Sequence, residues 1–253
     1  MVSVPRRAEP RNRFFLHFVP NRGTIRIRAM NAPLLHCRDL QCVRPLWREG
    51  ASHVRGVTAE FAAGEFHAIR GSEGCGKNLL LHLLGQLERP DAGEVWLDDL
   101  NLTELEESAR DRLRQRTFGF LFPACALLPS LTVLENIAFP VLKAGEASET
   151  EQAEHTLAAL QFCALEDEAE TRVADLPADR QAAATFARAM IHRPRLLLAE
   201  SPGAEEILVP LARRAVDELG LTVIWGARPD GPATQAADRV LDMCEGQLAV
   251  PAA

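Results

Sequence analysis

The chain has 253 residues, of which 47% are hydrophobic and 25% charged, and its formal net charge is −7. This composition is typical of a globular protein with one large domain. Residues 1–29 contain seven arginines and one glutamate, so residues 30–253 carry −13, and such an acidic body argues against a nucleic-acid partner.

The six cysteines form no C-x-x-C pair and no cluster with histidine at zinc spacing, which predicts reduced thiols. The longest uncharged stretch, 117–134, is interrupted by Pro123 and Pro129 and does not suit a membrane span. We therefore expect any role at a membrane to depend on a partner.

The first 29 residues are rich in arginine and do not begin with an apolar region, so a secretory signal is not expected. A transit peptide is an alternative. Sequence typical of a folded domain begins at Met30. The chain is thus predicted to have a disordered tail or an over-extended start at 1–29 and one folded domain at 30–253.

Apolar and alternating runs at 34–43 and 57–69 predict a small antiparallel sheet that leads into a core strand. The residues that follow alternate between short apolar runs, which predict buried strands, and longer segments of helical periodicity. The predicted strands are 94–97, 118–122, 196–199 and 221–227, the predicted helices are 103–116, 134–142, 149–162, 180–191 and about 208–219, and a hairpin is predicted at 240–250. Such alternation predicts a mostly parallel sheet covered on both faces.

A glycine-rich turn between the strand at 66–70 and a leucine-rich helix satisfies the spacing G-x-x-x-x-G-K. In such a turn, glycines let backbone N–H groups surround a phosphate, the helix N-terminus adds partial positive charge, and the lysine reaches the outer phosphates. The predicted phosphate site is formed by Gly71, Ser72, Glu73, Gly74, Cys75, Gly76, Lys77 and Asn78.

Two residues of this turn depart from the pattern. Asn78 stands where a serine or threonine would bind Mg²⁺, and its amide oxygen is a weaker ligand. Glu73 places a carboxylate beside the expected anion, and two such charges about 4–6 Å apart repel by roughly 3–4 kcal/mol at an effective dielectric of about 20, unless the side chain points to solvent or a metal ion lies between them. We therefore expect weakened nucleotide binding.

The surrounding segments are similar to the ATP-binding subunits of ABC transporters, most closely those of the lipoprotein-release and macrolide-export type. The resemblance spans about 34–250 and rests on the glycine-rich turn together with 64–66, 80–85, 87–94, 127–137 and 238–241. It implies an α/β P-loop NTPase core with a mostly parallel sheet, a small antiparallel β subdomain and a helical subdomain at about 124–190.

The same resemblance implies ATP and Mg²⁺ as cofactors and a dimer in which each ATP lies between one chain's P-loop and the other's signature loop. The dimer is a homodimer or a heterodimer with another cassette. Membrane-spanning subunits are expected to dock near residues 124–140, which would place the chain in the cytoplasm, peripherally at the inner face of the cytoplasmic membrane.

The resemblance also identifies the positions that would carry hydrolysis, and none holds the expected residue. Pro123 replaces a glutamine that contacts Mg²⁺ and the attacking water, Ser201 replaces a glutamate that polarises this water, and Arg228 replaces a histidine. Glu200 stands where an aspartate serves the metal, and its longer side chain can still reach it. Asn78 and Glu200 are therefore the candidate Mg²⁺ ligands.

Two binding positions are changed as well. The signature, expected to read Leu-Ser-Gly-Gly-Gln, is replaced by Leu176, Pro177, Ala178, Asp179 and Arg180. The aromatic residue that stacks on adenine aligns near Arg44, and Trp47 lies close enough in sequence to replace it by a small shift. The alternative is that Arg44 itself stacks on the base through cation–π or planar stacking.

Taken together, these changes predict a nucleotide-binding transporter subunit with weak or absent hydrolysis. The alternative is a non-enzymatic regulatory or vestigial cassette, favoured by the loss of both the chain's own catalytic residues and the signature that it would lend to a partner. A P-loop kinase of small molecules is a third hypothesis, and the resemblance after residue 86 argues against it.

Overall fold

The computed structural model describes residues 33–45, 51–123, 126–144, 148–200 and 203–249. The expectation for residues 1–29, the aromatic candidate Trp47 and the catalytic position Ser201 lie outside these ranges. The tail at 1–29 and the folded domain from Met30 therefore stay predictions.

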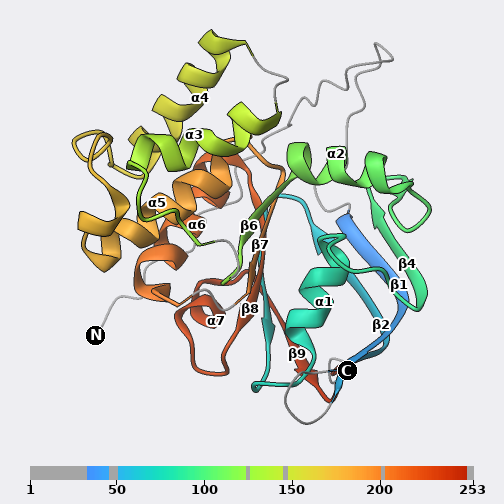
Figure 1. Ribbon diagram of the computed structural model, residues 1–253. Helices are drawn as coiled ribbons and strands as arrows, with labels where there is room; N and C mark the ends of the chain where they lie inside the picture. The colour runs from blue at the N-terminus through green and yellow to red at the C-terminus, as the bar shows by residue number, and fades with distance from the viewer. Residues whose placement is uncertain (1–32, 46–50, 124–125, 145–147, 201–202, 250–253) are drawn as a thin grey trace, which may run out of the picture. The chain divides into compact units, whose positions relative to one another are not determined.

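The central sheet has six strands in the order β10-β9-β3-β8-β7-β6. Figure 1 labels β6, β7, β8 and β9 of this sheet. The strands from β9 to β6 pair in parallel, and β10 pairs antiparallel with β9. Their bounds are β3 Phe66–Arg70, β6 Phe118–Leu121, β7 Leu196–Glu200, β8 Thr222–Ala227, β9 Arg239–Cys244 and β10 Gln247–Leu248. Every residue of β8 is buried, as expected for a strand covered on both faces.

The second sheet is antiparallel and has four strands in the order β2-β1-β4-β5. The strands are β1 Pro33–Pro45, β2 Ala51–Ala62, β4 Ala92–Leu97 and β5 Leu100–Asn101. The register shifts near Asp39, which has φ 47°, and Gly93 lies against its carbonyl oxygen. The predicted small antiparallel sheet is thereby confirmed, with β1 and β2 longer than the apolar runs that indicated them.

The helices divide between the two faces of the central sheet (Figure 1). Their bounds are α1 Lys77–Leu84, α2 Glu107–Thr117, α3 Val133–Ala144, α4 Glu149–Phe162, α5 Ala178–Met190, α6 Glu205–Leu219 and α7 Pro232–Ala236. The leucines of α1 pack between the central sheet and the antiparallel sheet, whereas α3 to α6 form a core with the opposite face. The α/β class predicted from the sequence is confirmed, and α7 was missed because five residues give no periodic signal.

The start of α4 shows how local sequence sets a boundary. Ser148 accepts a hydrogen bond from the backbone N–H of Glu151, and the Glu151 carboxylate accepts one from the Ser148 N–H. This reciprocal pair satisfies two N–H groups that a helix end otherwise leaves unpaired. None of the helices in the described part of the chain combines the length and apolar character that crossing a bilayer requires.

Candidate functional site

The glycine-rich turn connects the end of β3 to the start of α1 and has two residues in the left-handed region, Gly74 at φ 78° and Gly76 at φ 102°. A Cβ on Gly76 would lie 2.3 Å from the His53 carbonyl oxygen, so packing as well as φ requires glycine there. A Cβ on Gly74 would meet no atom within 4 Å. The turn is therefore closed at Gly76 by β2 and open at Gly74.

Lys77 folds back over this turn. Its Nζ donates a hydrogen bond to the Ser72 carbonyl oxygen at 3.0 Å, and the residue is only 6% exposed. An ammonium group held across a turn at a helix N-terminus is suited to an anion with several phosphate oxygens. Glu73 is exposed, so solvent screens the repulsion between its carboxylate and a phosphate bound in the turn.

The turn between β9 and β10 holds the loop from behind. The Gly246 N–H donates to the Cys75 carbonyl oxygen at 2.8 Å, and the Gly246 carbonyl oxygen accepts from the Arg55 N–H at 2.8 Å. A single glycine thus joins the glycine-rich turn, the predicted phosphate loop at Gly71–Asn78, to β2. The sequence predicts this hairpin but carries no signal that its turn supports the loop.

Glu200, at the end of β7, connects to α1 through both carboxylate oxygens. Oε1 accepts a hydrogen bond from Asn78 Nδ2 at 2.6 Å, and Oε2 lies 3.0 Å from His82 Nε2. The His82 ring stacks on Phe122 with centroids 5.1 Å apart and planes 18° apart. The structure therefore brings the two candidate metal ligands together, and adds His82 and Phe122, which sequence reasoning had assigned no role.

These residues do not fit a divalent cation in this arrangement. Mg²⁺ takes oxygen ligands in octahedral geometry, whereas Asn78 presents its N–H₂ group to Glu200, and an amide nitrogen is a donor only. Both oxygens of the carboxylate already have nitrogen partners. Across the described ranges, no three His, Cys, Asp or Glu side chains gather closely enough to hold a metal ion.

The other positions of the expected hydrolytic site lie near the same sheet edge. Pro123 is exposed in the turn after β6, and Arg228 is exposed directly after β8. Neither proline nor an arginine guanidinium accepts a proton at neutral pH, so neither can act as a general base.

The replaced signature lies at the start of α5. Leu176 is buried, Pro177 precedes the first helical residue, and Ala178 and Asp179 are exposed. Arg180 makes a bidentate ion pair with Glu168, with Nε–Oε1 at 2.8 Å and Nη2–Oε2 at 2.7 Å. The hydrogen bonds from Arg180 lower the pKa of the Glu168 carboxyl below its ordinary value.

Arg44, the adenine-stacking candidate at the end of β1, is engaged by neighbouring groups. Its guanidinium donates to Glu88 at 3.2 Å, to Asp91 at 2.9 Å and to the Arg89 carbonyl oxygen at 2.6 Å. If Arg44 stacks on a base, its guanidinium plane must do so in the orientation that these hydrogen bonds fix.

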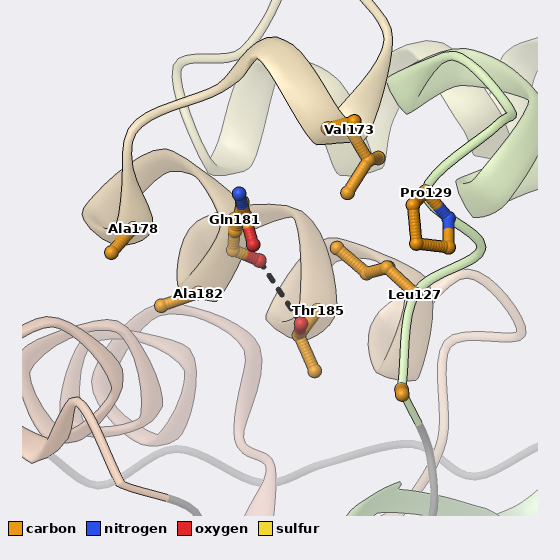
Figure 2. A pocket seen from close by; sticks show the side chains of 9 residues that line it. Leu127, Pro129, Val173, Ala178, Gln181, Ala182 and Thr185 are labelled. Carbon is orange, nitrogen blue, oxygen red and sulfur yellow. Dashed lines mark hydrogen bonds between the residues drawn. The ribbon is translucent and has the colours of Figure 1, made fainter.

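An open pocket of about 470 Å³ lies between the segment that precedes α3 and the N-terminal half of α5 (Figure 2). Figure 2 shows Leu127 and Pro129 on one side of it and Gln181 and Thr185 of α5 on the other. The Arg188 guanidinium donates to the Ala126 carbonyl oxygen at 2.9 Å, which ties this segment to α5. The pocket is lined by Ala126, Leu127, Pro129, Val173, Ala174, Ala178, Gln181, Ala182 and Thr185.

Comparison with known proteins decides the family. The sequence profile of the ABC transporter family matches residues 54–204. This chain is a member of the ABC transporter family. The cassette is 32% identical over 222 residues to the lipoprotein-releasing system ATP-binding protein LolD of Pseudomonas fluorescens, covering 85% of this chain and 96% of that protein.

A second relative of the cassette is a larger protein. The macrolide export ATP-binding/permease protein MacB of Brucella melitensis is 32% identical over 224 residues, which are 86% of this chain and 34% of MacB. The cassette thus spans about a third of the length of MacB. The predicted likeness to the lipoprotein-release and macrolide-export type is confirmed.

Solved structures support the same fold for the cassette. The dimeric ATP-binding cassette MJ0796 in a post-hydrolysis state with ADP and Pi has a TM-score of 0.73 and 25% identity, covering 85% of this chain and 97% of that one. CbiO1 from Clostridium perfringens, part of the ABC transporter complex CbiONQ, has a TM-score of 0.75 and 21% identity, covering 87% and 88%. The cassette therefore has the fold of an ABC ATP-binding cassette.

Proposed function

We propose that this cassette binds ATP through Gly71–Asn78 and hydrolyses it slowly or not at all. The observation that carries the proposal is the contrast between Lys77, which is held across the glycine-rich turn, and the hydrogen-bonded cluster of Asn78, His82 and Glu200 at the end of this turn. Lys77 is buried across the loop. Glu200, by contrast, has each of its carboxylate oxygens hydrogen-bonded, one to Asn78 and the other to His82.

Hydrolysis requires a group that positions and deprotonates water. Ser201 follows Glu200 where such a base is expected, Pro123 offers no polar side chain, and Arg228 cannot shuttle a proton. Loss of a positioned base alone lowers a rate by roughly 10²–10⁴. Because such losses are not additive, we expect a turnover near the background rate rather than the product of the separate factors.

The cassette also provides a poor signature for a partner's nucleotide. Asp179 adds a negative charge at the start of α5, and Arg180 is paired with Glu168. In a dimer of the kind named for MJ0796, both shared sites would then be impaired. This supports the alternative that the cassette is a regulatory or vestigial subunit that folds and binds nucleotide without turning it over.

The partner that we propose is a membrane-spanning subunit. The pocket between Leu127 and Thr185 opens in the 124–140 region, where such a subunit is expected to dock. MacB is named as an ATP-binding/permease protein, and this chain matches a third of it, so a permease is a reasonable partner. The cassette would then lie at the cytoplasmic face of the membrane, as a homodimer or with another cassette.

Nucleotide binding and phosphate release by the purified chain test the proposal. We expect ATP to bind and phosphate release to stay near background, and Lys77→Ala to abolish binding. Lys143→Ala is the matched control, because Lys143 is a second lysine outside the loop. Turnover at rates typical of ATPases that disappears in Lys77→Ala would contradict the proposal, as would no ATP binding at all.

A further inference from the structure

We propose that the cassette binds its nucleotide without a divalent metal ion, because the cluster of Asn78, His82 and Glu200 occupies the position of the metal site with hydrogen bonds of its own. The inference rests on the proposed nucleotide binding. It concerns the cofactor requirement of that same site.

The chemistry of Asn78 is the first reason. A serine or threonine hydroxyl can donate its hydrogen to a carboxylate and offer a lone pair of the same oxygen to a metal ion. The Asn78 nitrogen that contacts Glu200 at 2.6 Å has no lone pair to offer, because it is conjugated with the carbonyl group. Reversing the amide would break this hydrogen bond and set the amide oxygen against Oε1, which is repulsive in the absence of a cation between the two oxygens.

The second reason is that Glu200 is already satisfied. Its Oε2 lies 3.0 Å from His82 Nε2, and its side chain is 17% exposed. The His82 ring is held against Phe122 by stacking, which fixes the direction of its N–H. To bind a metal ion, Glu200 would have to give up its hydrogen bonds to Asn78 and His82. Both donors are carried by α1, and His82 is also held by its stacking on Phe122, directly after β6.

The charges around the site are the third reason. Lys77 and the N–H groups at the start of α1 provide the positive potential of the loop. Pro123 contributes no ligand from the loop after β6. These donors would meet the phosphates, and among the described residues no group of three His, Cys, Asp or Glu side chains offers a metal ion a set of ligands.

Calorimetric titration of the full chain with ATP tests this inference in two buffers of equal ionic strength, one with MgCl₂ and one with EDTA. We expect the two dissociation constants to agree within about threefold. A loss of about tenfold or more in EDTA would overturn the inference and leave the proposed nucleotide binding intact. No binding in either buffer would overturn both.

Two variants assign the effect to the cluster. Asn78→Ser restores a hydroxyl beside Glu200, and we expect binding to become at least about tenfold tighter in MgCl₂ than in EDTA. Because Asn78 is exposed, we expect the substitution to preserve the fold, which circular dichroism of the variant checks. His82→Leu removes the second partner of Glu200, and combined with Asn78→Ser it should increase the difference between ATP binding in MgCl₂ and in EDTA further. His155→Leu on α4 is the control and should not change this difference. An Asn78→Ser chain that stays indifferent to Mg²⁺ would overturn the role given to Asn78.

Discussion

Gly246 and Cys75 are 171 positions apart in the sequence, yet the Gly246 N–H donates to the Cys75 carbonyl oxygen at 2.8 Å. Gly246 has φ 81°, and a Cβ there would lie 2.7 Å from the His53 carbonyl oxygen. The phosphate loop is therefore held in place by a turn that only glycine can form so close to β2.

We expect Gly246→Ala to weaken nucleotide binding and to destabilise the fold by about 1–3 kcal/mol, the range for a residue forced into a sparsely populated conformation. The change pushes His53 away and displaces the N–H that supports Cys75. Urea unfolding and calorimetric ATP titration measure the two effects.

Gly64→Ala separates backbone strain from displacement of the loop. Gly64 has φ 71°, but a Cβ there would meet its nearest atom at 3.8 Å, and the loop is not among its contacts. We expect a comparable loss of stability with unchanged affinity for ATP. If the two variants lower affinity equally, Gly246 has no special role in positioning the loop.

The ion pair between Arg180 and Glu168 predicts a pH-dependent contribution to stability. Arg180 lowers the pKa of Glu168 in the folded chain, so its contribution is present above the ordinary value of 4.5 and is lost as the pH falls through the lowered pKa. Because both side chains are partly exposed, we expect Arg180→Gln to cost at most about 1 kcal/mol at neutral pH.

Thermal unfolding of both chains across that pH range measures the contribution. The difference between wild type and Arg180→Gln should shrink as Glu168 becomes protonated. A difference that stays constant with pH would mean that Arg180 stabilises α5 through its contact with the Ala164 carbonyl oxygen instead.

Most of the fold could be predicted because it is encoded in local patterns. The buried strands at 196–199 and 221–227 are short apolar runs, and the boundary at Ser148 follows from a capping pair three residues apart. The glycine-rich turn between β3 and α1 could be predicted for the same reason, since its glycines and Lys77 lie within eight consecutive residues, and its role as a phosphate site stays a prediction.

The support around the loop could not be predicted, because it depends on contacts between distant residues. His82 and Glu200 are 118 positions apart, and only the packing of α1 against β7 brings His82 Nε2 to 3.0 Å from Glu200 Oε2. Gly246 reaches Cys75 in the same way. No single-sequence pattern encodes such a distance, and a histidine in a leucine-rich helix has no distinguishing spacing.

We expect Arg44→Ala to lower nucleotide affinity less than Trp47→Ala. The Arg44 guanidinium is hydrogen-bonded to Glu88, Asp91 and a carbonyl oxygen, so these contacts hold its side chain beside the end of β1 and limit its freedom to stack on a base. Calorimetric titration of the two variants with ATP compares them. A larger loss for Arg44→Ala would assign base stacking to the arginine.

His67 predicts a loss of stability on acidification. It is fully buried on β3, with Nε2 3.2 Å from the Ala62 carbonyl oxygen, and burial lowers its pKa from 6.5 to about 4. Between these values the unfolded chain binds a proton that the folded chain does not, so stability falls as the pH falls from 6.5 to about 4. The loss reaches about 3 kcal/mol, since one pKa unit corresponds to about 1.4 kcal/mol.

Urea unfolding of wild type and His67→Gln at a series of pH values checks this. Glutamine keeps a donor for the Ala62 carbonyl oxygen but does not titrate, so the variant should lose less stability than wild type on acidification. His155→Gln on α4 is the control and should follow wild type, because its ring is only partly buried. Parallel pH profiles for wild type and His67→Gln would mean that His67 does not carry the acid sensitivity of the fold.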